Sequence, residues 1–468
     1  MENSDFKKAL HFDEFPPIST EEWEAIIEKD LKGKDYKDVL RWKSGEGINP
    51  LPFYREENLP DLSSSPEPMA SHGSWTVMER VESSSLSEAN KEALHALENG
   101  ASGLYFCPEN NYLHSLEDLR NLLEDIQIEL ITIRFGSTVS SPSIADWLNE
   151  ISKGRKLTEE ELSVSFNFDP ISYAALSGKL ASKTDIEKTL NAFGEVFSFC
   201  AIDSSVFANA GATIIQQLAF SLAAGNEYLG FNSKMGGNLN FNFATGPNYF
   251  LEIAKFRAFK RTWGQVLDEY GLNNITPSIH AETSFWNKSQ SDAHNNMLRT
   301  TTEAMSAAIG GCNSITVHRY DEHFSKDSGF SSRIARNIQL ILQEEAYLDK
   351  VADPGAGSYY IEMLTDSMAQ KSWELFQDIE AKGGFYEALN SGYIQELVAA
   401  SRKEKIEAYQ HKEKVLVGVN KYQPDKKIQN LEFNIQNFTS FDPDNLESIT
   451  VDDISLLNIE AELKNGEG

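Results

Sequence analysis

Residues 104–135, LYFCPENNYLHSLEDLRNLLEDIQIELITIRF, decide the fold of this chain. Short apolar runs open and close the stretch at Leu104–Cys107 and Leu130–Phe135. Between them, Ser115–Asp125 has the apolar spacing of an amphipathic helix. A strand, a helix and a second strand in this order predict a β-α-β unit, in which the two strands lie parallel in one sheet.

The same alternation extends from about residue 100 to about residue 320. The further strands are expected at Ser163–Asn167, Phe197–Ile202, Tyr228–Phe231, Leu239–Phe243, Thr276–Glu282 and Ser314–His318. Helical patterns fill most of the gaps, at Ser143–Ile151, Ile186–Gly194, Ala208–Ala223, Asn248–Tyr270 and Asp292–Ala308. Eight strands with intervening helices predict a (β/α)8 TIM barrel, with a doubly wound sheet as the alternative. The crossover after Tyr228–Phe231 is too short for a full helix, and a further helix over Ser331–Leu348 is expected to close the ring.

The barrel is flanked by two segments with different patterns. An irregular N-terminal extension is expected over residues 1–73, with a helix that begins at Ser19 or Thr20 and has Glu22 placed for a capping box. The barrel domain then covers residues 74–425, and an acidic tail covers residues 426–468. The tail is too short for a second nucleotide- or cofactor-sized domain, so no cofactor-binding domain is expected after the barrel.

Composition excludes several classes of function. The 468 residues include 40% hydrophobic and 24% charged residues, which is typical of a soluble globular protein. Forty-two basic and 71 acidic residues give a net charge of −29, which disfavours nucleic acid as a partner. There is no apolar run of the roughly 20 residues that a membrane span needs, and no signal-peptide pattern at the start. The three cysteines lack CxxC spacing and are expected to be free, buried thiols in a cytoplasmic protein.

Polar residues at the ends of the last two predicted strands are the candidates for chemistry. His280 and Glu282 end the seventh strand, and His318 ends the eighth. Active sites of TIM barrels lie at this C-terminal face, and residues two apart on a strand share one side. These side chains could bind a divalent metal or serve as acid and base. The interpretation that we favour is that they are polar fillings of the barrel mouth, with no metal site.

A long segment identifies a family. Residues 333–358, RIARNIQLILQEEAYLDKVADPGAGS, resemble the signature of the methylmalonyl-CoA mutase family, with Ile338 as the one departure. Further matches follow in the same order along the chain, at EGI (46–48), SWTV (74–77), NAGAT (209–213), FLEIAKFR (250–257), HAETSFW (280–286), NNMLRTTTEAM (295–305) and GVNKY (418–422). The likeness covers roughly residues 40 to 422. It implies a TIM barrel independently of the strand count.

The family resemblance also implies a chemistry. In catalytic members, a C-terminal cobalamin domain caps the barrel, the CoA arm of the substrate threads through its centre, and adenosylcobalamin starts a radical rearrangement of methylmalonyl-CoA to succinyl-CoA. A tyrosine-histidine pair before the AGA motif and a tyrosine after the WTIR-like motif hold the substrate.

This chain departs from the family at those positions. The tyrosine-histidine pair is replaced by Ser205 and Val206, and the second tyrosine by Arg80. An arginine on the seventh strand is replaced by Ser278, although His280 remains. Valine cannot donate a hydrogen bond or share a proton, so no catalytic residue is expected in this chain. Bulky side chains on the sixth strand could also fill the barrel, at Phe241 and Phe243.

The resemblance therefore implies a silent subunit. Some bacterial members are heterodimers in which a barrel without cofactor or substrate pairs with a large catalytic chain. In this interpretation the chain binds no cofactor itself, adenosylcobalamin lies in the partner subunit, and the apolar N-terminal extension embraces that partner. The expected interface residues are Trp23, Trp42, Leu51 and Phe53.

Two alternatives remain. One is an active mutase barrel that works with a separate cobalamin-binding chain. The other is an unrelated TIM-barrel enzyme that uses His280, Glu282 and His318.

Overall fold

A parallel sheet forms the centre of the molecule. The computed structural model describes residues 18–59, 73–158, 161–193, 198–199, 201–233, 237, 239–273, 275–325, 329–424 and 448–465. Within the sheet the strands follow the order β6-β4-β3-β2-β1-β10-β9-β8-β7. The strands are β1 (Thr76–Val81), β2 (Gly103–Phe106), β3 (Thr132–Phe135), β4 (Ser163–Phe166), β6 (Ser198–Phe199), β7 (Ala201–Asp203), β8 (Asn240–Thr245), β9 (Ser278–Thr283) and β10 (Ser314–Thr316).

The two edges of this sheet meet. β6 pairs with β4 at one edge and β7 pairs with β8 at the other, yet only residue 200 separates β6 from β7 in the chain. All pairs in the sheet are parallel, and β1 pairs with β10, so the chain passes round the ring in sequence order. The predicted TIM barrel is confirmed.

Helices surround the barrel and continue beyond it. They are α1 (Thr20–Asp30), α2 (Tyr36–Leu40), α3 (Leu86–Glu98), α4 (Leu116–Leu122), α5 (Pro142–Arg155), α6 (Pro170–Ser177), α7 (Lys183–Ala192), α8 (Ser205–Ala210), α9 (Ile214–Phe231), α10 (Tyr249–Glu269), α11 (Asn295–Ile309), α12 (Phe330–Glu344), α13 (Tyr359–Glu380), α14 (Phe385–Asn390), α15 (Tyr393–Gln410) and α16 (Ile459–Asn465). None of these described helices is both long and apolar enough to cross a membrane.

One predicted strand of the barrel is wrong, and one strand of the barrel was missed. Residues Tyr228–Phe231 are the last turn of α9, because a short apolar run on a buried helix has the same composition as a strand. The missing strand is β1, whose sequence TVMERV contains two charged residues. Both charges are paired: Glu79 accepts a 2.6 Å hydrogen bond from Arg336 on α12, and Arg80 lies in the barrel mouth. These two charged residues interrupt the apolar run of the strand, although the fold pairs both of them. The apolar pattern therefore did not predict β1.

The outer side of the barrel is apolar and packs on the helices. The Phe241 ring lies 4.6 Å from the Phe259 ring and 4.8 Å from the Trp263 ring, both on α10. Phe243 packs at 4.9 Å on the same Phe259. The expectation that Phe241 and Phe243 fill the barrel is therefore wrong, because both point outward against α10.

The inner side of the barrel is polar. Arg134 on β3 donates a hydrogen bond to Asn242 on β8, and the Tyr105 ring on β2 lies 6.0 Å from the His280 ring on β9. These strands are not neighbours in the sheet, so the contacts cross the interior. Some buried polar atoms there have no protein partner, among them Arg134 Nε and Asn242 Nδ2. Most TIM barrels fill this space with branched apolar side chains, so the interior of this one is unusual.

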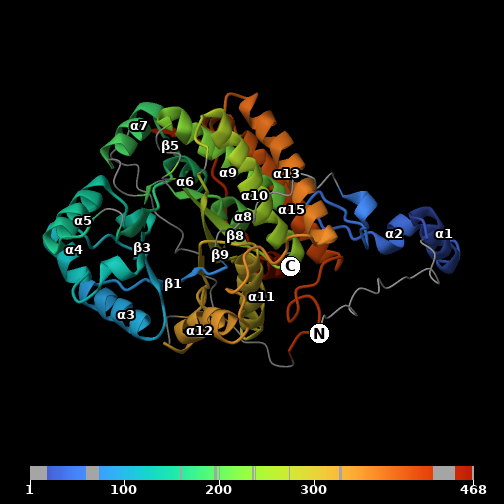
Figure 1. The fold of residues 1–468 in the computed structure, drawn as a ribbon, viewed down its shortest axis with the longest axis horizontal. Coiled ribbons are helices and arrows are strands. Elements are labelled where there is room, and N and C mark those ends of the chain that lie inside the picture. The colour runs from blue at the N-terminus through green and yellow to red at the C-terminus, as the bar shows by residue number, and fades with distance from the viewer. Residues whose placement is uncertain are drawn as a thin grey trace, which may run out of the picture.

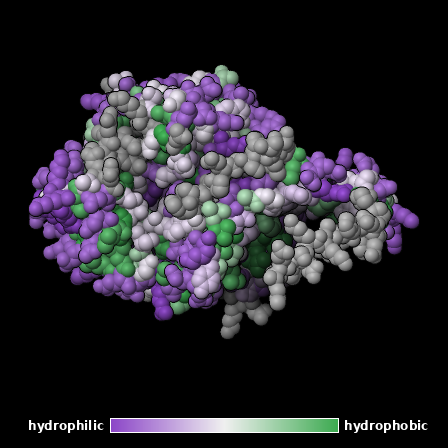
Figure 2. Space-filling model, viewed as in Figure 1, coloured by the Kyte–Doolittle hydropathy of each residue, from purple (hydrophilic) through white to green (hydrophobic). Residues whose placement is uncertain are grey.

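The N-terminal residues that the structure describes, 18–59, project from the barrel, and we call them the arm. The predicted capping box is confirmed, since Ser19 and Glu22 each accept a hydrogen bond from the other's backbone N–H. Neither α1 nor α2 buries any residue, and both stand away from the body in Figure 1. Figure 2 shows apolar side chains in the recess between the arm and the body. The arm joins the body through residues 44–48, where Glu46 is buried and accepts a 2.7 Å hydrogen bond from the backbone of Ile214.

A segment near the C-terminus covers loops at the C-terminal face of the barrel. β11 (Ser448–Thr450) pairs antiparallel with β5 (Lys179–Ala181). Beyond it, the backbone N–H of Leu457 donates to the Asn209 carbonyl and that of Ile459 donates to the Trp286 carbonyl. Leu457 and Ile459 are buried in a small apolar cluster with Trp286. We call residues 448–465 the covering segment; it lies within the predicted acidic tail.

We expect Leu457→Ala to lower the free energy of unfolding by about 2–5 kcal/mol, because a fully buried side chain leaves a cavity. Chemical denaturation followed by circular dichroism measures this change. Ile449→Ala is the matched control, since Ile449 lies in the same segment but is 45% exposed. The control should change stability by no more than about 0.5 kcal/mol. Equal effects of the two substitutions would contradict the packing described here.

Candidate functional site

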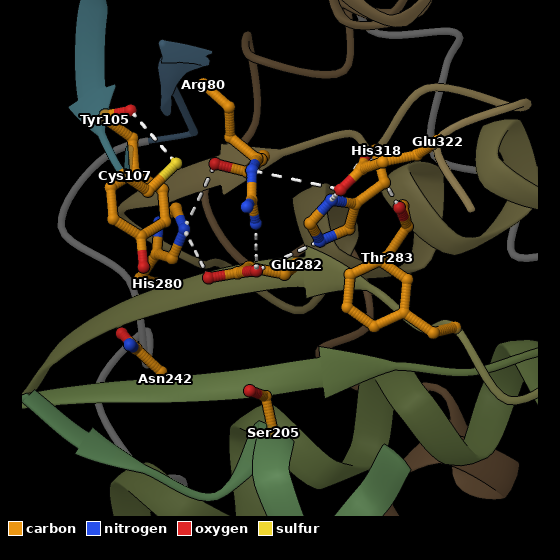
Figure 3. Close-up of polar contacts among 12 residues, drawn as sticks. Arg80, Tyr105, Cys107, Ser205, Asn242, His280, Glu282, Thr283, His318 and Glu322 are labelled. Carbon is orange, nitrogen blue, oxygen red and sulfur yellow. Dashed lines mark hydrogen bonds and ion pairs between the residues drawn. The ribbon is translucent and has the colours of Figure 1, made fainter. Parts of the chain in front are cut away.

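Five ionisable side chains meet where β1, β9 and β10 end (Figure 3). His318 Nε2 lies 3.0 Å from Glu282 Oε2, and His318 Nδ1 lies 3.1 Å from both carboxylate oxygens of Glu322. Arg80 Nη2 lies 2.7 Å from Glu82, and Arg80 also approaches Glu282 at 3.9 Å and Glu322 at 4.0 Å. We call these residues the mouth cluster. The structure thus brings together four of the predicted residues: Arg80, Glu282 and His318 in the mouth cluster, and His280, whose Nε2 lies 3.6 Å from Glu282 Oε1.

The strand register explains how the seventh and eighth strands supply this site. On β9, His280 and Glu282 are two residues apart and share the inner side. Their partners in the parallel register are Ser314 and Thr316 on β10. His280 Nδ1 lies 2.7 Å from the Ser314 hydroxyl and Nε2 lies 3.2 Å from the Thr316 hydroxyl. The predicted common orientation of His280 and Glu282 is therefore present, but the hydroxyl groups of β10 occupy both ring nitrogens of His280.

Burial and charge set the protonation of the two histidines in opposite directions. Burial lowers the pKa of His280 to about 4, and the nearby Arg134 adds to this effect. Burial also disfavours the charged form of His318, but Glu322 and the hydrogen bond to Glu282 outweigh burial and raise its pKa. One ring is therefore held neutral, whereas the two carboxylates favour the protonated form of the other.

The two carboxylates remain ionised. Burial raises the pKa of Glu282, but hydrogen bonds to His280 and His318 outweigh it, and the resulting pKa is well below the ordinary value. The attraction of His318 and Arg80 likewise outweighs burial at Glu322, whose pKa is also well below the ordinary value. A general base needs a pKa near the working pH, so these carboxylates suit ion pairing better than proton transfer.

Arg80 closes the space above the cluster. Its guanidinium stands 5.6 Å from the centre of the Tyr105 ring, and its side chain is 13% exposed. The cavity beside it, between β1, β10 and α12, has a volume of about 20 Å³. That is enough for about one water molecule. Within the described part of the chain, no group of three or more His, Cys, Asp and Glu side chains is arranged to hold a metal ion.

The other positions where the family has substrate-binding groups lie apart from the mouth cluster. Ser205 and Val206 begin α8, and Figure 3 places Ser205 away from Arg80. The Ser205 hydroxyl donates a 2.5 Å hydrogen bond to Asp203, and Val206 is fully buried. Burial, with repulsion from Glu282, raises the pKa of Asp203 to about 7. Ser278 is exposed at the start of β9, at the opposite end of the strand from Glu282.

Several residues of the site were not found from the sequence. Glu322 follows the eighth strand in a loop, so no strand or helix periodicity marks it. Tyr105 and Arg134 lie on the second and third strands, within runs that were identified only as apolar. Polar residues at alternate positions of a strand are the signal that could have found Arg134, since its neighbours Ile133 and Phe135 are fully buried on the other side.

The predicted interface residues lie on the arm. Trp23 is 37% exposed and Trp42 is 46% exposed, whereas Leu51 and Phe53 are half-buried. The Trp23 and Phe53 rings pack edge to face, with centroids 3.8 Å apart. Arg55 ties the start of α1 down through a 2.8 Å hydrogen bond to the Ile18 carbonyl. The arm is thus an ordered element that presents tryptophan side chains to its surroundings.

Comparisons with known proteins agree on one family. The family pattern described as "Methylmalonyl-CoA mutase" matches residues 112–455. The methylmalonyl-CoA mutase small subunit of Porphyromonas gingivalis is 37% identical, over 89% of this chain and 71% of that protein. The small subunit of Streptomyces virginiae is 28% identical over 87% and 71%, and the methylmalonyl-CoA mutase of Rhizobium meliloti is 31% identical over 86% and 63%. The chain spans about two thirds of the length of these relatives.

The low pKa of His280 gives a testable pH dependence. Since the folded-state pKa of about 4 lies below the ordinary histidine value of 6.5, the unfolded chain binds a proton first as the pH falls. Between about pH 7 and about pH 5 this costs the folded state about 2 kcal/mol, a cost that is absent above the unfolded-state pKa. Replacing His280 with Gln should therefore make the loss of stability over this interval smaller by about that amount.

Urea denaturation at the two pH values measures the difference. His411→Gln is the matched control, because His411 is exposed at the end of α15. If His280→Gln and the parent chain lose stability equally on acidification, His280 is not held neutral in the barrel.

Proposed function

Because the chain belongs to the methylmalonyl-CoA mutase family, we propose that it is the small, catalytically silent subunit of a heterodimeric, adenosylcobalamin-dependent methylmalonyl-CoA mutase. In this proposal the large subunit binds the cofactor and converts methylmalonyl-CoA to succinyl-CoA in the cytoplasm. The present chain supports the large subunit through its arm. The observation that carries the proposal is Arg80, which stands where catalytic members have a tyrosine and is paired with three carboxylates.

The pairing of Arg80 leaves no group at the mouth for a substrate thioester. Glu82, Glu282 and Glu322 hold the guanidinium, and His318 is held between Glu282 and Glu322. A substrate that entered would have to break buried ion pairs, and removing one partner of such a pair costs about 3–5 kcal/mol. The mouth cluster therefore supports the proposal that ion pairs among the chain's own side chains close the barrel to a substrate.

The position of the family's tyrosine-histidine pair, held here by Ser205 and Val206, supports the same conclusion. Val206 has no polar atom in its side chain, and the Ser205 hydroxyl is already bonded to Asp203. Neither can polarise a thioester carbonyl as an imidazole or a phenol does. His280, the residue that remains from the family pattern, is engaged by two hydroxyl groups of β10.

The C-terminal face does not suit adenosylcobalamin. The covering segment is hydrogen-bonded to the loops after β7 and β9, where Asn209 and Trp286 lie. Glu460 accepts hydrogen bonds from the backbone N–H groups of Gln290 and Ser291, at 2.6 Å and 3.2 Å. These loops are the surface on which a cobalamin domain would have to dock, and the chain's own residues engage them. We therefore place no cofactor on this chain.

The arm supports a role in assembly. Trp23, Trp42 and Val39 on the arm are each more than a third exposed, and neither α1 nor α2 contains a buried residue. Tryptophan is enriched among the residues that dominate binding energy in protein interfaces. Small-subunit names among the relatives point to a partner of larger size, which fits the same surface.

A second candidate function is an active mutase barrel served by a separate cobalamin-binding chain. The observation in its favour is the polar barrel interior, where Arg134 Nε and Asn242 Nδ2 are buried without a protein partner. A polar ligand along the barrel axis would satisfy such atoms. The unrelated TIM-barrel enzyme that uses His280, Glu282 and His318 is not proposed further, because the family is established.

We expect the purified chain to form no succinyl-CoA from methylmalonyl-CoA when adenosylcobalamin and a free cobalamin domain are supplied. The physical reason is the paired Arg80 and the apolar Val206 at the substrate positions. A coupled assay for succinyl-CoA measures turnover, and the complex with the large subunit is the positive control. Turnover by this chain with the free cobalamin domain would contradict the silent-subunit proposal and favour the active barrel.

We expect Trp42→Ala to weaken binding of the large subunit by about 2 kcal/mol, or roughly thirtyfold in Kd, as for a buried tryptophan anchor. Surface plasmon resonance with the immobilised large subunit measures this. Leu298→Ala is the matched control, because Leu298 is 68% exposed on α11 of the barrel body. An unchanged Kd for Trp42→Ala, or no binding by the parent chain, would count against the arm as the interface.

A further inference from the structure

A large cavity lies between the arm and α15, outside the barrel. Its volume is about 740 Å³, within the range of small-molecule sites. One wall is formed by residues 39–45 of the arm, and the other by α15 and the turn that follows it. The lining side chains include Trp42, four cationic groups (Arg41, Lys43, Lys405 and Lys414) and two carboxylates (Glu404 and Glu413).

The charge of this cavity is opposite to that of the chain. Four cations face two carboxylates in a protein whose net charge is −29. Among the described residues, none of the four cationic groups forms an ion pair with a carboxylate. Cations gathered in one cavity repel one another, and a bound anion would offset that repulsion.

The two lysines are held in place. Lys405 is buried, donates a 3.2 Å hydrogen bond to the Ala212 carbonyl, and has its ammonium 4.3 Å from the centre of the Trp286 ring. Lys414 is half-buried and packs against Gly45, where a Cβ would come within 2.5 Å of the ammonium nitrogen. Gly45 also has a φ of +76°, which favours glycine. Glycine at position 45 thus tolerates the positive φ and leaves the space that the Lys414 ammonium occupies.

One nearby carboxylate offsets part of this charge. Glu46 faces Lys405, and its two oxygens accept hydrogen bonds from the Ile214 backbone and the Asn248 side chain, at 2.7 Å and 3.2 Å. Burial lowers the pKa of Lys405 to about 8 despite the attraction of Glu46, and repulsion from Lys414 contributes. In the opposite wall, which the arm forms, Arg41 Nε is buried and has no hydrogen-bond partner among the described residues.

We propose that this cavity is a binding site for a small molecule that carries a phosphate or pyrophosphate group. Arg41 and Lys414 contact the anion from the two walls, and the buried Lys405 closes the inner end. Guanidinium and ammonium groups that converge from separate elements form charge-assisted hydrogen bonds to phosphate oxygens. A compact ligand fits better than an acidic peptide, because the cavity ends at a buried ammonium. The site does not depend on the proposed function, since its anchoring charges lie outside the mouth cluster.

Isothermal titration of the full chain with inorganic pyrophosphate at low salt tests the site. We expect saturable binding at one site per chain, and Lys414→Gln and Arg41→Gln should each weaken it by about tenfold to a hundredfold. Lys403→Gln is the matched control, because Lys403 lies on α15, which forms one wall, but its side chain is 77% exposed and outside the cavity. The control removes the same charge and should leave the affinity within about twofold, since exposed charges are screened.

Circular dichroism and thermal unfolding of each variant show whether it folds, so that a lost site is not mistaken for a lost fold. Absence of saturable binding by the parent chain would overturn the proposal. So would equal weakening by Lys414→Gln and Lys403→Gln, because the effect would then be one of net charge. If Lys414→Gln weakened binding of the large subunit but left pyrophosphate affinity unchanged, the cavity would belong to the protein interface and the small-molecule site would be wrong.

Discussion

The pairing of charges at the mouth of the barrel constrains the rest of the structure. Three of the five ionisable groups are buried, Arg80 and Glu82 are half-buried, and each of the five lies within 4.0 Å of a group of opposite charge. Desolvation makes such a set costly unless every member keeps its partner. β1, β9 and β10 must therefore stay in register, because a shift by one residue would turn Arg80 or Glu282 to the apolar outer side. The ion pair between Glu79 and Arg336 fixes α12 against the same strand.

The C-terminal face of the barrel is covered by the chain itself, whereas the arm is exposed. At the C-terminal face of the barrel, the mouth cluster fills the interior and the covering segment holds the loops. On the arm, by contrast, tryptophan side chains are exposed and α1 and α2 bury nothing. The tryptophan side chains exposed on the arm suit the role in assembly that we propose for this chain.

The sequence predicts the barrel well, because most of its strands are apolar runs between amphipathic helices. It fails at Tyr228–Phe231, where a buried helix and a strand have the same composition, and at β1, where Glu79 and Arg80 interrupt the apolar pattern. Arg80, Glu282 and His318 were each singled out from the sequence, but their mutual pairing depends on three strands that are far apart in the chain. The role of Glu322 and the outward direction of Phe241 follow from tertiary contacts alone. The boundaries of the extension, barrel and tail remain predictions.

The covering segment has a consequence for how the protein is made. Its partners, which include Gly178, Asn209 and Trp286, are synthesised more than 150 residues before Leu457 and Ile459 reach them. The ring of strands can close on the ribosome, but the loops after β7 and β9 lack their hydrogen-bond partners until residues 448–465 emerge. During that interval Trp286 and Tyr409 are open to solvent at the top of a nearly complete barrel. This face therefore matures only after residues 448–465 have been synthesised, and nascent chains that lack them are vulnerable to aggregation there.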